Sequence, residues 1–189
     1  MKQFKNLMDI IKTRRSIRRY SDRPVEDEKI KAIVEAARWA PSASNSQCWR
    51  FIVVKDKNIK KQVVEKGLGG MIIPNEWAKT APVIIVACAH LNFVTHRLGA
   101  AIKGIEYWLL DMGIAVEHLV LRATELGLGT CWIGWFNERW IRKILKIPRN
   151  IKIVALVTLG YPAEDLKLKE PQRLSLEEIL FFNKYGKSI

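Results

Sequence analysis

The longest apolar segment of the chain, residues 105–126, limits the folds open to this sequence more than any other feature. Apolar residues recur there at the spacing of an α-helix and fill one face of it. Leu110, Ile114 and Leu121 widen that face until little polar surface remains. We therefore expect a helix that is covered on most sides, by the core and by a subunit interface. The first face consists of Ile105, Trp108, Leu109, Met112, Ala115, Val116, Leu119, Val120, Ala123 and Leu126.

The other elements form one domain, residues 1–189, without repeats or linkers. Periodicity and capping signals predict helices over 4–13 and 27–40, a lysine-rich helix after Asp56, and a helix capped by Asn137. Apolar runs predict strands over 50–54, 82–89, 130–136 and 151–159. The second of these strands is fully apolar and should be central, and the third should contain a glycine kink. Gly67, Gly69 and Gly70 indicate a flexible stretch.

Composition indicates a folded, soluble protein. Of its 189 residues 49% are hydrophobic, and the mean hydropathy is near zero, which excludes a disordered or fibrous class. Lysine and arginine number 32 against 19 acidic residues, so the formal net charge is +13, which indicates an anionic ligand, a nucleic acid or simply a lysine-rich proteome, and charge alone does not choose among them. The lysines are scattered and no nucleic-acid-binding signature is present. Nucleic-acid binding is therefore a weak alternative, and we predict no such partner.

Cysteine and histidine spacing argues against metal and disulfide sites. Cys48, Cys88 and Cys131 are odd in number and far apart, which favours buried thiols in a reducing cytosol. His90 and His96 lack a constellation of metal ligands, so we expect no metal. The amino terminus has no apolar signal core, and the apolar runs are too short or too charged to span a bilayer. We therefore predict a cytoplasmic location and no membrane association.

Four arginines crowd into residues 13–20, Thr-Arg-Arg-Ser-Ile-Arg-Arg-Tyr. The guanidinium groups of Arg14, Arg15 and Arg18 can donate paired hydrogen bonds to phosphate oxygens, and the Ser16 hydroxyl adds another donor. These residues could hold a compact phosphate. The alternative is a solvated basic turn.

A second unusual stretch, residues 40–51, reads Ala-Pro-Ser-Ala-Ser-Asn-Ser-Gln-Cys-Trp-Arg-Phe and turns from a polar loop into a strand. Ser42, Asn45 and Gln47 can both donate and accept hydrogen bonds, which suits the edge of a heteroaromatic ring with carbonyls and ring nitrogens. A capping and turn segment is an equally good interpretation.

Together the two stretches resemble the FMN-dependent nitroreductase family. The family carries an RRSxR segment, a helix, and then APSxxNxQPW entering the first long strand. The order and spacing agree here from Arg14 onwards, and the resemblance continues to Ile179. Cys48 stands where the family usually has proline, which predicts a less rigid loop.

The resemblance implies an α+β fold, a central mixed but mostly antiparallel sheet flanked by helices in three layers. It also implies an FMN site. The phosphate would be bound by Arg14, Arg15, Ser16 and the late arginine Arg173, which precedes a "PLxxI"-like segment with Ser175 in place of proline. Arg18 would lie at the N1 and O2 edge of the ring. The loop would contribute Pro41, Ser42, Ala43, Asn45 and Gln47, and the backbone of Trp132, Ile133 and Gly134 would lie along the ring, although strand packing alone also explains Gly134.

By the same resemblance the protein would be a homodimer with shared flavin sites that takes hydride from NADH or NADPH and reduces a small electron-poor acceptor. The flavin carries this chemistry, so we expect no catalytic nucleophile. Two alternatives stay open: a reductive dehalogenase or flavin-cleaving member of the same superfamily, and a non-enzymatic FMN-binding protein. The segments 67–80 and 90–104, which include Trp77 and Phe93, would form the lids that distinguish among the enzymes.

Overall fold

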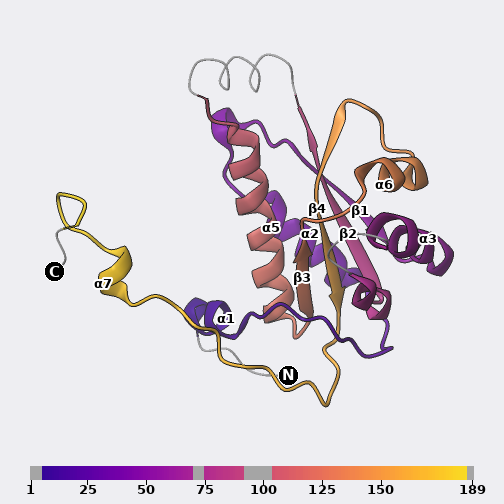
Figure 1. The fold of residues 1–189 in the computed structure, drawn as a ribbon, viewed down its shortest axis with the longest axis horizontal. Coiled ribbons are helices and arrows are strands. Elements are labelled where there is room, and N and C mark those ends of the chain that lie inside the picture. Colours follow the sequence, from indigo (N-terminus) through magenta and orange to yellow (C-terminus); the bar gives the residue numbers. More distant parts are fainter. Residues whose placement is uncertain (1–5, 70–74, 92–103, 187–189) are drawn as a thin grey trace.

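A computed structural model describes residues 6–69, 75–91 and 104–186. Its centre is a four-stranded sheet in the order β1-β2-β4-β3, formed by β1 (Trp49–Val54), β2 (Val83–His90), β4 (Ile151–Gly160) and β3 (Gly129–Ile133) (Figure 1). All three strand pairings are antiparallel. The predicted mixed pairing is limited, within the described residues, to one isolated parallel bridge between Ser16 and Thr130.

Helices cover both faces of the sheet and bury β2 on both sides. Ile85, Ala87 and Ala89 pack in one hydrophobic cluster with α2 (Asp27–Arg38) and α5 (Tyr107–Glu125). The alternate residues of β2 point to the other face and pack against η2 (Val63–Leu68) and α6 (Glu138–Leu145). The predicted α+β fold with three layers is therefore confirmed (Figure 1).

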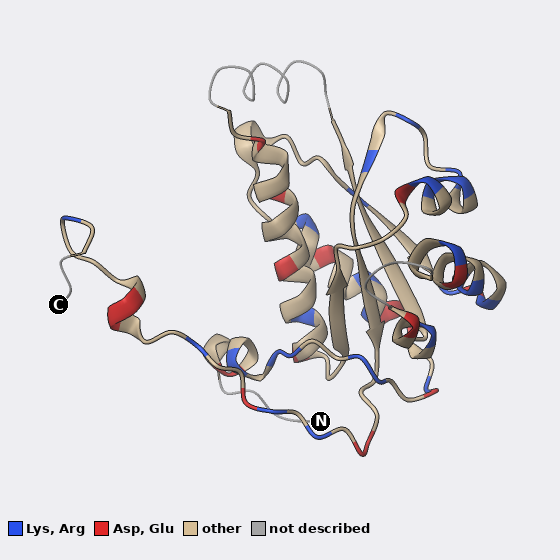
Figure 2. Ribbon diagram, in the orientation of Figure 1, with Lys and Arg blue, Asp and Glu red and all other residues tan. Residues whose placement is uncertain are grey.

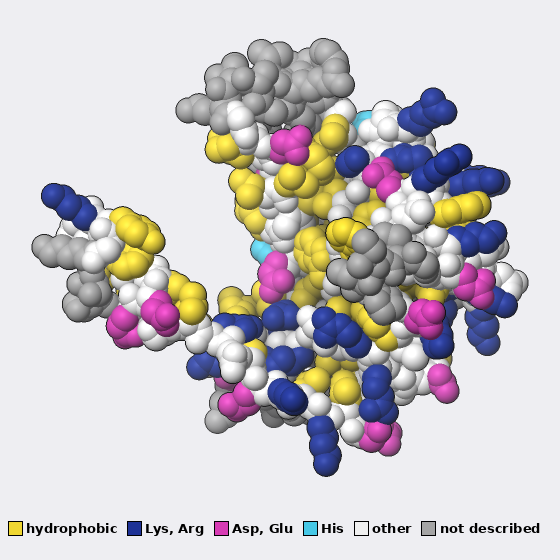
Figure 3. All heavy atoms as spheres, in the orientation of Figure 1, with side chains coloured by type: hydrophobic (Ala, Val, Ile, Leu, Met, Phe, Trp, Pro, Cys, Tyr) yellow, Lys and Arg dark blue, Asp and Glu magenta, His cyan; other side chains and the backbone are white. Residues whose placement is uncertain are grey.

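The predicted apolar helix is α5, and one chain covers only part of it. Met112, Ala115, Val116, Leu119 and Ala123 are fully buried against the sheet and α2. On the outer side Leu110 and Ile114, one turn apart, keep 55% and 39% of their surface exposed. Figure 3 shows hydrophobic side chains along this outer side. The expected core packing is confirmed, and the described residues of one chain leave a second apolar surface uncovered.

Two predictions about the segments around α6 are wrong. The third strand ends at Ile133 rather than at residue 136, because the backbone beyond it bonds elsewhere: Trp135 O accepts from the Asn75 amide, and Asn137 N donates to Gly67 O at 2.8 Å. Gly67 is not part of a flexible stretch. It lies in the π-helix η2, where an added Cβ would be 2.4 Å from Ile141 of α6, so glycine permits this close helix contact.

The remaining helices agree with the predictions to within a few residues. The first, α1 (Leu7–Thr13), is capped by Asn6, and residues 4 and 5 of the predicted helix lie outside the described part. The lysine-rich helix is α3 (Lys57–Gln62), capped by Asp56. Two 3₁₀ turns, η1 (Ala43–Asn45) and η3 (Glu76–Thr80), were not predicted. A short α7 (Leu176–Ile179) lies in a carboxyl-terminal tail that extends away from the body (Figure 1).

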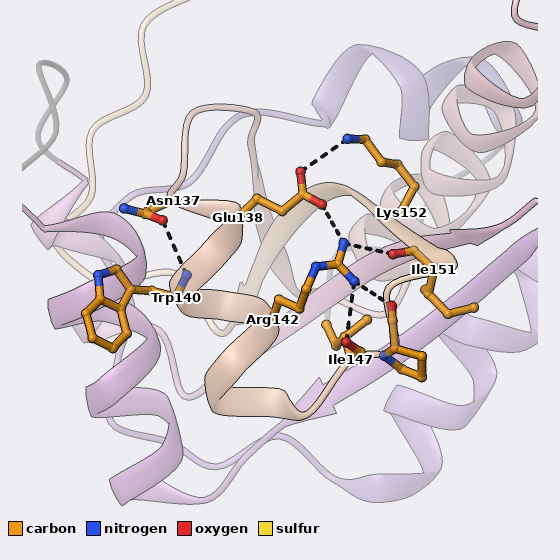
Figure 4. A network of polar contacts seen from close by, with 8 residues as sticks. Asn137, Glu138, Trp140, Arg142, Ile147, Ile151 and Lys152 are labelled. Carbon is orange, nitrogen blue, oxygen red and sulfur yellow. Dashed lines mark hydrogen bonds and ion pairs between the residues drawn. The ribbon is translucent and has the colours of Figure 1, made fainter.

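The helix α6 is fixed to β4 by a polar network drawn in Figure 4. Asn137 caps the amino end as predicted, accepting from Trp140 N at 3.3 Å. The Arg142 guanidinium pairs with Glu138 and donates to Ile151 O at 2.9 Å. It also donates to the carbonyls of Ile147 and Pro148. Arg142 thus satisfies the carbonyl groups of the connecting loop and sets the point at which β4 begins.

Candidate functional site

The arginine-rich segment is extended and is attached to the first residues of β3. Ile17 N donates to Thr130 O at 2.8 Å, next to the bridge between Ser16 and Thr130. Ile17 is buried and packs on Gly129. A Cβ added at Gly129 would lie 2.6 Å from the Ile17 side chain, so this close contact requires glycine at position 129. The neighbours of Ile17 in the chain, Ser16 and Arg18, are exposed.

Arg14 and Arg15 line a cavity of about 470 Å³ beside this segment. Arg23 and Lys29 are the other charged residues among its described lining, and no carboxylate is among them. Arg23 and Lys29 are already paired with Glu26, at 2.9 and 3.7 Å. The cavity is therefore positively charged, and Arg14 and Arg15 carry most of the charge available to an anion. Figure 2 shows the basic residues that follow one another here, next to α1.

The two arginines differ in their local bonds. Nη1 of Arg15 donates to Lys12 O at 2.5 Å and to Arg14 O at 2.7 Å, so part of its guanidinium caps the carboxyl end of α1. Arg14 lies 3.9 Å from Glu117 of α5, a long and partly exposed ion pair. Of the two, Arg14 keeps more of its donors available for a ligand.

On the other side of the segment, three parts of the chain meet. The Arg18 guanidinium lies 5.7 Å from the centre of the Trp77 ring, and Asn75 donates to Trp135 O at 3.2 Å. Burial raises the pKa of Cys131, and the opposing influences of Arg18 and the Ser16 hydroxyl show that both are close to this thiol. The arginine segment, residues 75–77 and residues 131–135 therefore surround one region.

Sequence reasoning missed Asn75. Its side chain is 7% exposed, which is unusual for a polar residue, and it fixes the backbone just after β3. Nothing in the sequence distinguishes this asparagine from one in a solvated turn, because its partner is a backbone carbonyl 60 residues away.

The backbone at residues 132–134 is accessible. Trp132 is 41% exposed, Ile133 is buried against the core, and a Cβ on Gly134 would have no described atom within 4 Å. Packing in the strand therefore does not explain Gly134, which lies just beyond β3 in open space. A flat ligand can approach the backbone there.

The polar loop is held by a buried carboxylate on α5. Asp111, 3% exposed, accepts from Ala43 N at 2.9 Å and from the Ser46 hydroxyl at 3.2 Å. Inside the loop, Ser42 Oγ accepts from Gln47 N, and the Gln47 amide donates to Asn45. These bonds fix the loop although Cys48 replaces the usual proline. Pro41 and Asn45 are exposed, and Ser42 and Ala43 are partly so.

Within one chain the loop lies apart from the point where the arginine segment is attached to β3. The loop is bound to Asp111 near the start of α5, Arg14 reaches α5 at Glu117, and Ser16 pairs with Thr130, after the last residue of the helix. At 1.5 Å per residue, about 9 Å of helix lie between Asp111 and Glu117, and about 20 Å between Asp111 and the carboxyl end. Arg173 lies in the extended tail, where its described hydrogen bond is to the neighbouring Gln172 O. The structure thus attaches Ser16 to Thr130, two residues before Trp132, Ile133 and Gly134, and places Arg14 and Arg15 in the neighbouring cavity. Neither Arg173 nor the loop is among the described lining of that cavity.

Comparisons with known proteins identify the family. A profile of the nitroreductase family matches residues 11–161. This chain belongs to the nitroreductase family. A putative NADH dehydrogenase/NAD(P)H nitroreductase of Archaeoglobus fulgidus is 39% identical to it, over 84% of this chain and 86% of the relative.

Two further relatives have FMN in their names. An FMN reductase [NAD(P)H] of Bacillus subtilis is 32% identical, over 84% of this chain and 66% of its own length. The crystal structure of an FMN-dependent nitroreductase from Clostridium difficile has a TM-score of 0.74 and 31% identity, covering 93% of this chain and 98% of that chain. With such relatives this member of the nitroreductase family is an oxidoreductase.

The three cysteines of this member of the nitroreductase family are buried thiols. Burial raises the pKa of Cys48 and Cys88 to about 11, with help from Asp111 at Cys48, and it also raises the pKa of Cys131, so the three thiols stay protonated and are poor nucleophiles. Among the described residues no cluster of three or more His, Cys, Asp or Glu side chains could hold a metal ion. The described helices also include none that is long and apolar enough to cross a membrane.

Gly134→Ala tests whether the open space at residues 132–134 is a ligand site. Since the new methyl group meets no described atom, we expect the free energy of unfolding of the apo protein to change by less than about 0.5 kcal/mol. FMN affinity, measured by fluorescence titration, should fall at least about tenfold, the equivalent of 1.4 kcal/mol, because the methyl group occupies the approach to the backbone. Arg149→Ala, in the exposed loop before β4, is the control. Unchanged FMN affinity in Gly134→Ala would exclude contact between the ring and this backbone.

Proposed function

We propose that this protein is an FMN-dependent NAD(P)H oxidoreductase that reduces nitroaromatic, quinone or similar electron-poor acceptors in a ping-pong cycle of hydride transfers. The observation that carries the proposal is the arginine segment: Ser16 and Ile17 attach it to Thr130 of β3, and Arg14 and Arg15 line a positively charged cavity. Just beyond the end of the same strand, the backbone at Gly134 is open. The names of the relatives support FMN as the cofactor and NAD(P)H as the donor.

Each part of this site would have a separate task. Bound FMN would supply the hydride chemistry. Arg14, Arg15 and Ser16 would bind its phosphate, with Arg173 if the tail brings it close. Arg18 would place a positive charge at the edge of the ring where negative charge appears on reduction. The backbone of residues 132–134 would lie along the ring and leave its outer face to the donor and the acceptor in turn.

The visible spectrum and anaerobic reduction test this function. We expect purified protein reconstituted with FMN to be yellow, to bleach on addition of NADH or NADPH without oxygen, and to regain its colour with a quinone or a nitroaromatic. Protein that binds FMN but is bleached by neither nicotinamide would be a flavin-binding protein without this activity. Protein that takes up no FMN would contradict the proposal altogether. An iodinated or brominated phenol as the acceptor distinguishes a reductive dehalogenase.

Arg14→Ala tests the phosphate site. Removing one charge-assisted contact of roughly 1.5–3 kcal/mol should weaken FMN binding by about one to two decades, and less at high salt. Riboflavin lacks the phosphate, so its affinity should stay within about twofold of the wild-type value. Arg149→Ala removes an exposed arginine from the loop before β4 and serves as the control. Equal losses for FMN and riboflavin would show that Arg14 does not bind the phosphate.

We further propose a homodimer in which each flavin site is shared. The outer side of α5 exposes Leu110 and Ile114, and a second copy across a two-fold axis would cover it. The loop is bound at Asp111, and the arginine segment meets α5 between Glu117 and the carboxyl end, about 9 to 20 Å further along the helix. An antiparallel pair of α5 helices would therefore place the loop of one chain beside the arginine segment of the other. The exposed apolar residues of the tail, Leu176 and Ile179 among them, would also contact the partner.

Mixed dimers test the sharing of sites. Arg14→Ala and Asn45→Ala chains, each poor at binding FMN alone, should recover up to one FMN per heterodimer when refolded together, because both lesions then fall in one site. Two different affinity tags isolate the heterodimers. Arg14→Ala mixed with Ser16→Ala is the control, since lesions on the same half damage both sites and no recovery is expected. FMN bound by the Arg14→Ala/Asn45→Ala heterodimer at the level of the separate mutants would mean that one chain builds each site.

The cytoplasmic location stays a prediction from the sequence. Measuring kcat/KM for both nicotinamides with one quinone acceptor determines which donor the protein prefers.

A further inference from the structure

Tyr20 closes the arginine segment and points into the protein rather than toward solvent. Its side chain is 7% exposed. The ring packs closely on Gly160 of β4, where an added Cβ would lie 2.9 Å from the ring atom Cδ1. The hydroxyl oxygen lies 2.6 Å from Ile17 O and 2.6 Å from Thr158 Oγ. Thr158 is fully buried in β4, so the hydroxyl connects the surface segment to a strand of the core.

The directions of these hydrogen bonds follow from the number of protons. A tyrosine hydroxyl has one proton, and Ile17 O can only accept, so Tyr20 donates to Ile17 O. The Thr158 hydroxyl then donates to the Tyr20 oxygen at 2.6 Å, and Cys131 O, 3.3 Å from Thr158, is its weaker alternative partner. Burial raises the pKa of Tyr20 far above neutrality, so the hydroxyl keeps its proton and remains a donor.

These bonds fix the backbone immediately before Arg18. Ile17 N donates to Thr130 O, which holds the peptide group between Ser16 and Ile17. Ile17 O accepts from Tyr20, which holds the peptide group between Ile17 and Arg18. With the Ile17 side chain buried, both flanking peptide groups have one orientation. The Arg18 side chain that follows them is exposed, and its guanidinium lies 5.7 Å from the ring of Trp77, which itself packs against the cluster of Ile17 and Tyr20.

We propose that the Tyr20 hydroxyl is a positioning group that, held by Thr158, aims Arg18 at the edge of the bound flavin. This inference rests on the proposed function, in which Arg18 stabilises the negative charge of the reduced ring. A phenylalanine would fill the same space, so only the hydroxyl gives the peptide group before Arg18 a fixed orientation. The ring of Tyr20 serves packing, and its hydroxyl serves the cofactor.

Tyr20→Phe and Arg18→Gln, alone and combined, test the proposal in the full chain. Arg18→Gln should leave FMN bound and make its two-electron potential, measured by spectroelectrochemistry, more negative. Tyr20→Phe should shift the potential in the same direction but less, and raise the FMN dissociation constant less than tenfold. In the double variant Tyr20→Phe should add no further shift to that of Arg18→Gln, because its effect passes through Arg18. In the apo protein, amide hydrogens of residues 16–19 should exchange faster in Tyr20→Phe.

Two controls separate positioning from general stability. Asp56→Ala removes the cap of α3, away from the arginine segment, and should lower stability without changing the potential. Thr158→Val removes the hydroxyl that anchors Tyr20 and should shift the potential in the same direction as Tyr20→Phe, which keeps the test available if Tyr20→Phe folds poorly.

The outcomes distinguish this inference from the function on which it rests. A Tyr20→Phe potential equal to the wild-type value, or an equal shift with and without Arg18, would overturn the role of Tyr20 and leave the flavin enzyme intact. An Arg18→Gln potential equal to the wild-type value would overturn both the proposed role of Arg18 and this inference.

Discussion

The burial of β2 on both faces is the constraint on which the rest of the structure depends. Its residues from Val83 to Ala89 are all within 1% of complete burial, so helices must cover the sheet on both sides. The helix α5 covers one side and brings its carboxyl end to the start of β3, where the arginine segment is attached. The position of the candidate site, at the end of α5 and the edge of β3, follows from this layering.

Buried polar groups set the shape of the two candidate binding segments. Asp111 holds the loop through Ala43 N and the Ser46 hydroxyl. Tyr20 and Thr158 hold the arginine segment through Ile17 O. Each of these sets of hydrogen bonds joins an exposed segment to an element of the core, α5 or β4. A buried polar group without a hydrogen-bond partner at these positions would cost about 1–3 kcal/mol of stability. The same hydrogen bonds that avoid this cost also fix the backbone next to exposed side chains.

The distribution of charge matches this division of the molecule. The net charge of +13 is spread over many lysines, yet the cavity beside the arginine segment stands out because no carboxylate is among its described lining. Arg23 and Lys29 are largely neutralised by Glu26, whereas Arg14 meets only a distant Glu117. Local pairing, rather than the total charge, thus selects Arg14 for an anionic ligand.

Periodicity was sufficient to predict the strands β1, β2 and β4 and the helices α2 and α5, because burial on a sheet or a helix face repeats along the sequence. Periodicity could not predict that β3 ends at Ile133, because the hydrogen bonds that redirect the chain there reach to Gly67 and Asn75, about 60 residues away.

The order of the two polar stretches likewise determined the family from the sequence, and the family matches residues 11–161. Only the tertiary structure decided how those stretches are used. It placed the loop at the start of α5 and the arginine segment between Glu117 and the carboxyl end, turned part of Arg15 to capping α1, and gave Asp111, Asn75 and Tyr20 their positions. A single hydrogen bond between residues distant in the chain leaves no periodic trace in the sequence. It exists only once the hydrophobic layers have brought its donor and acceptor together.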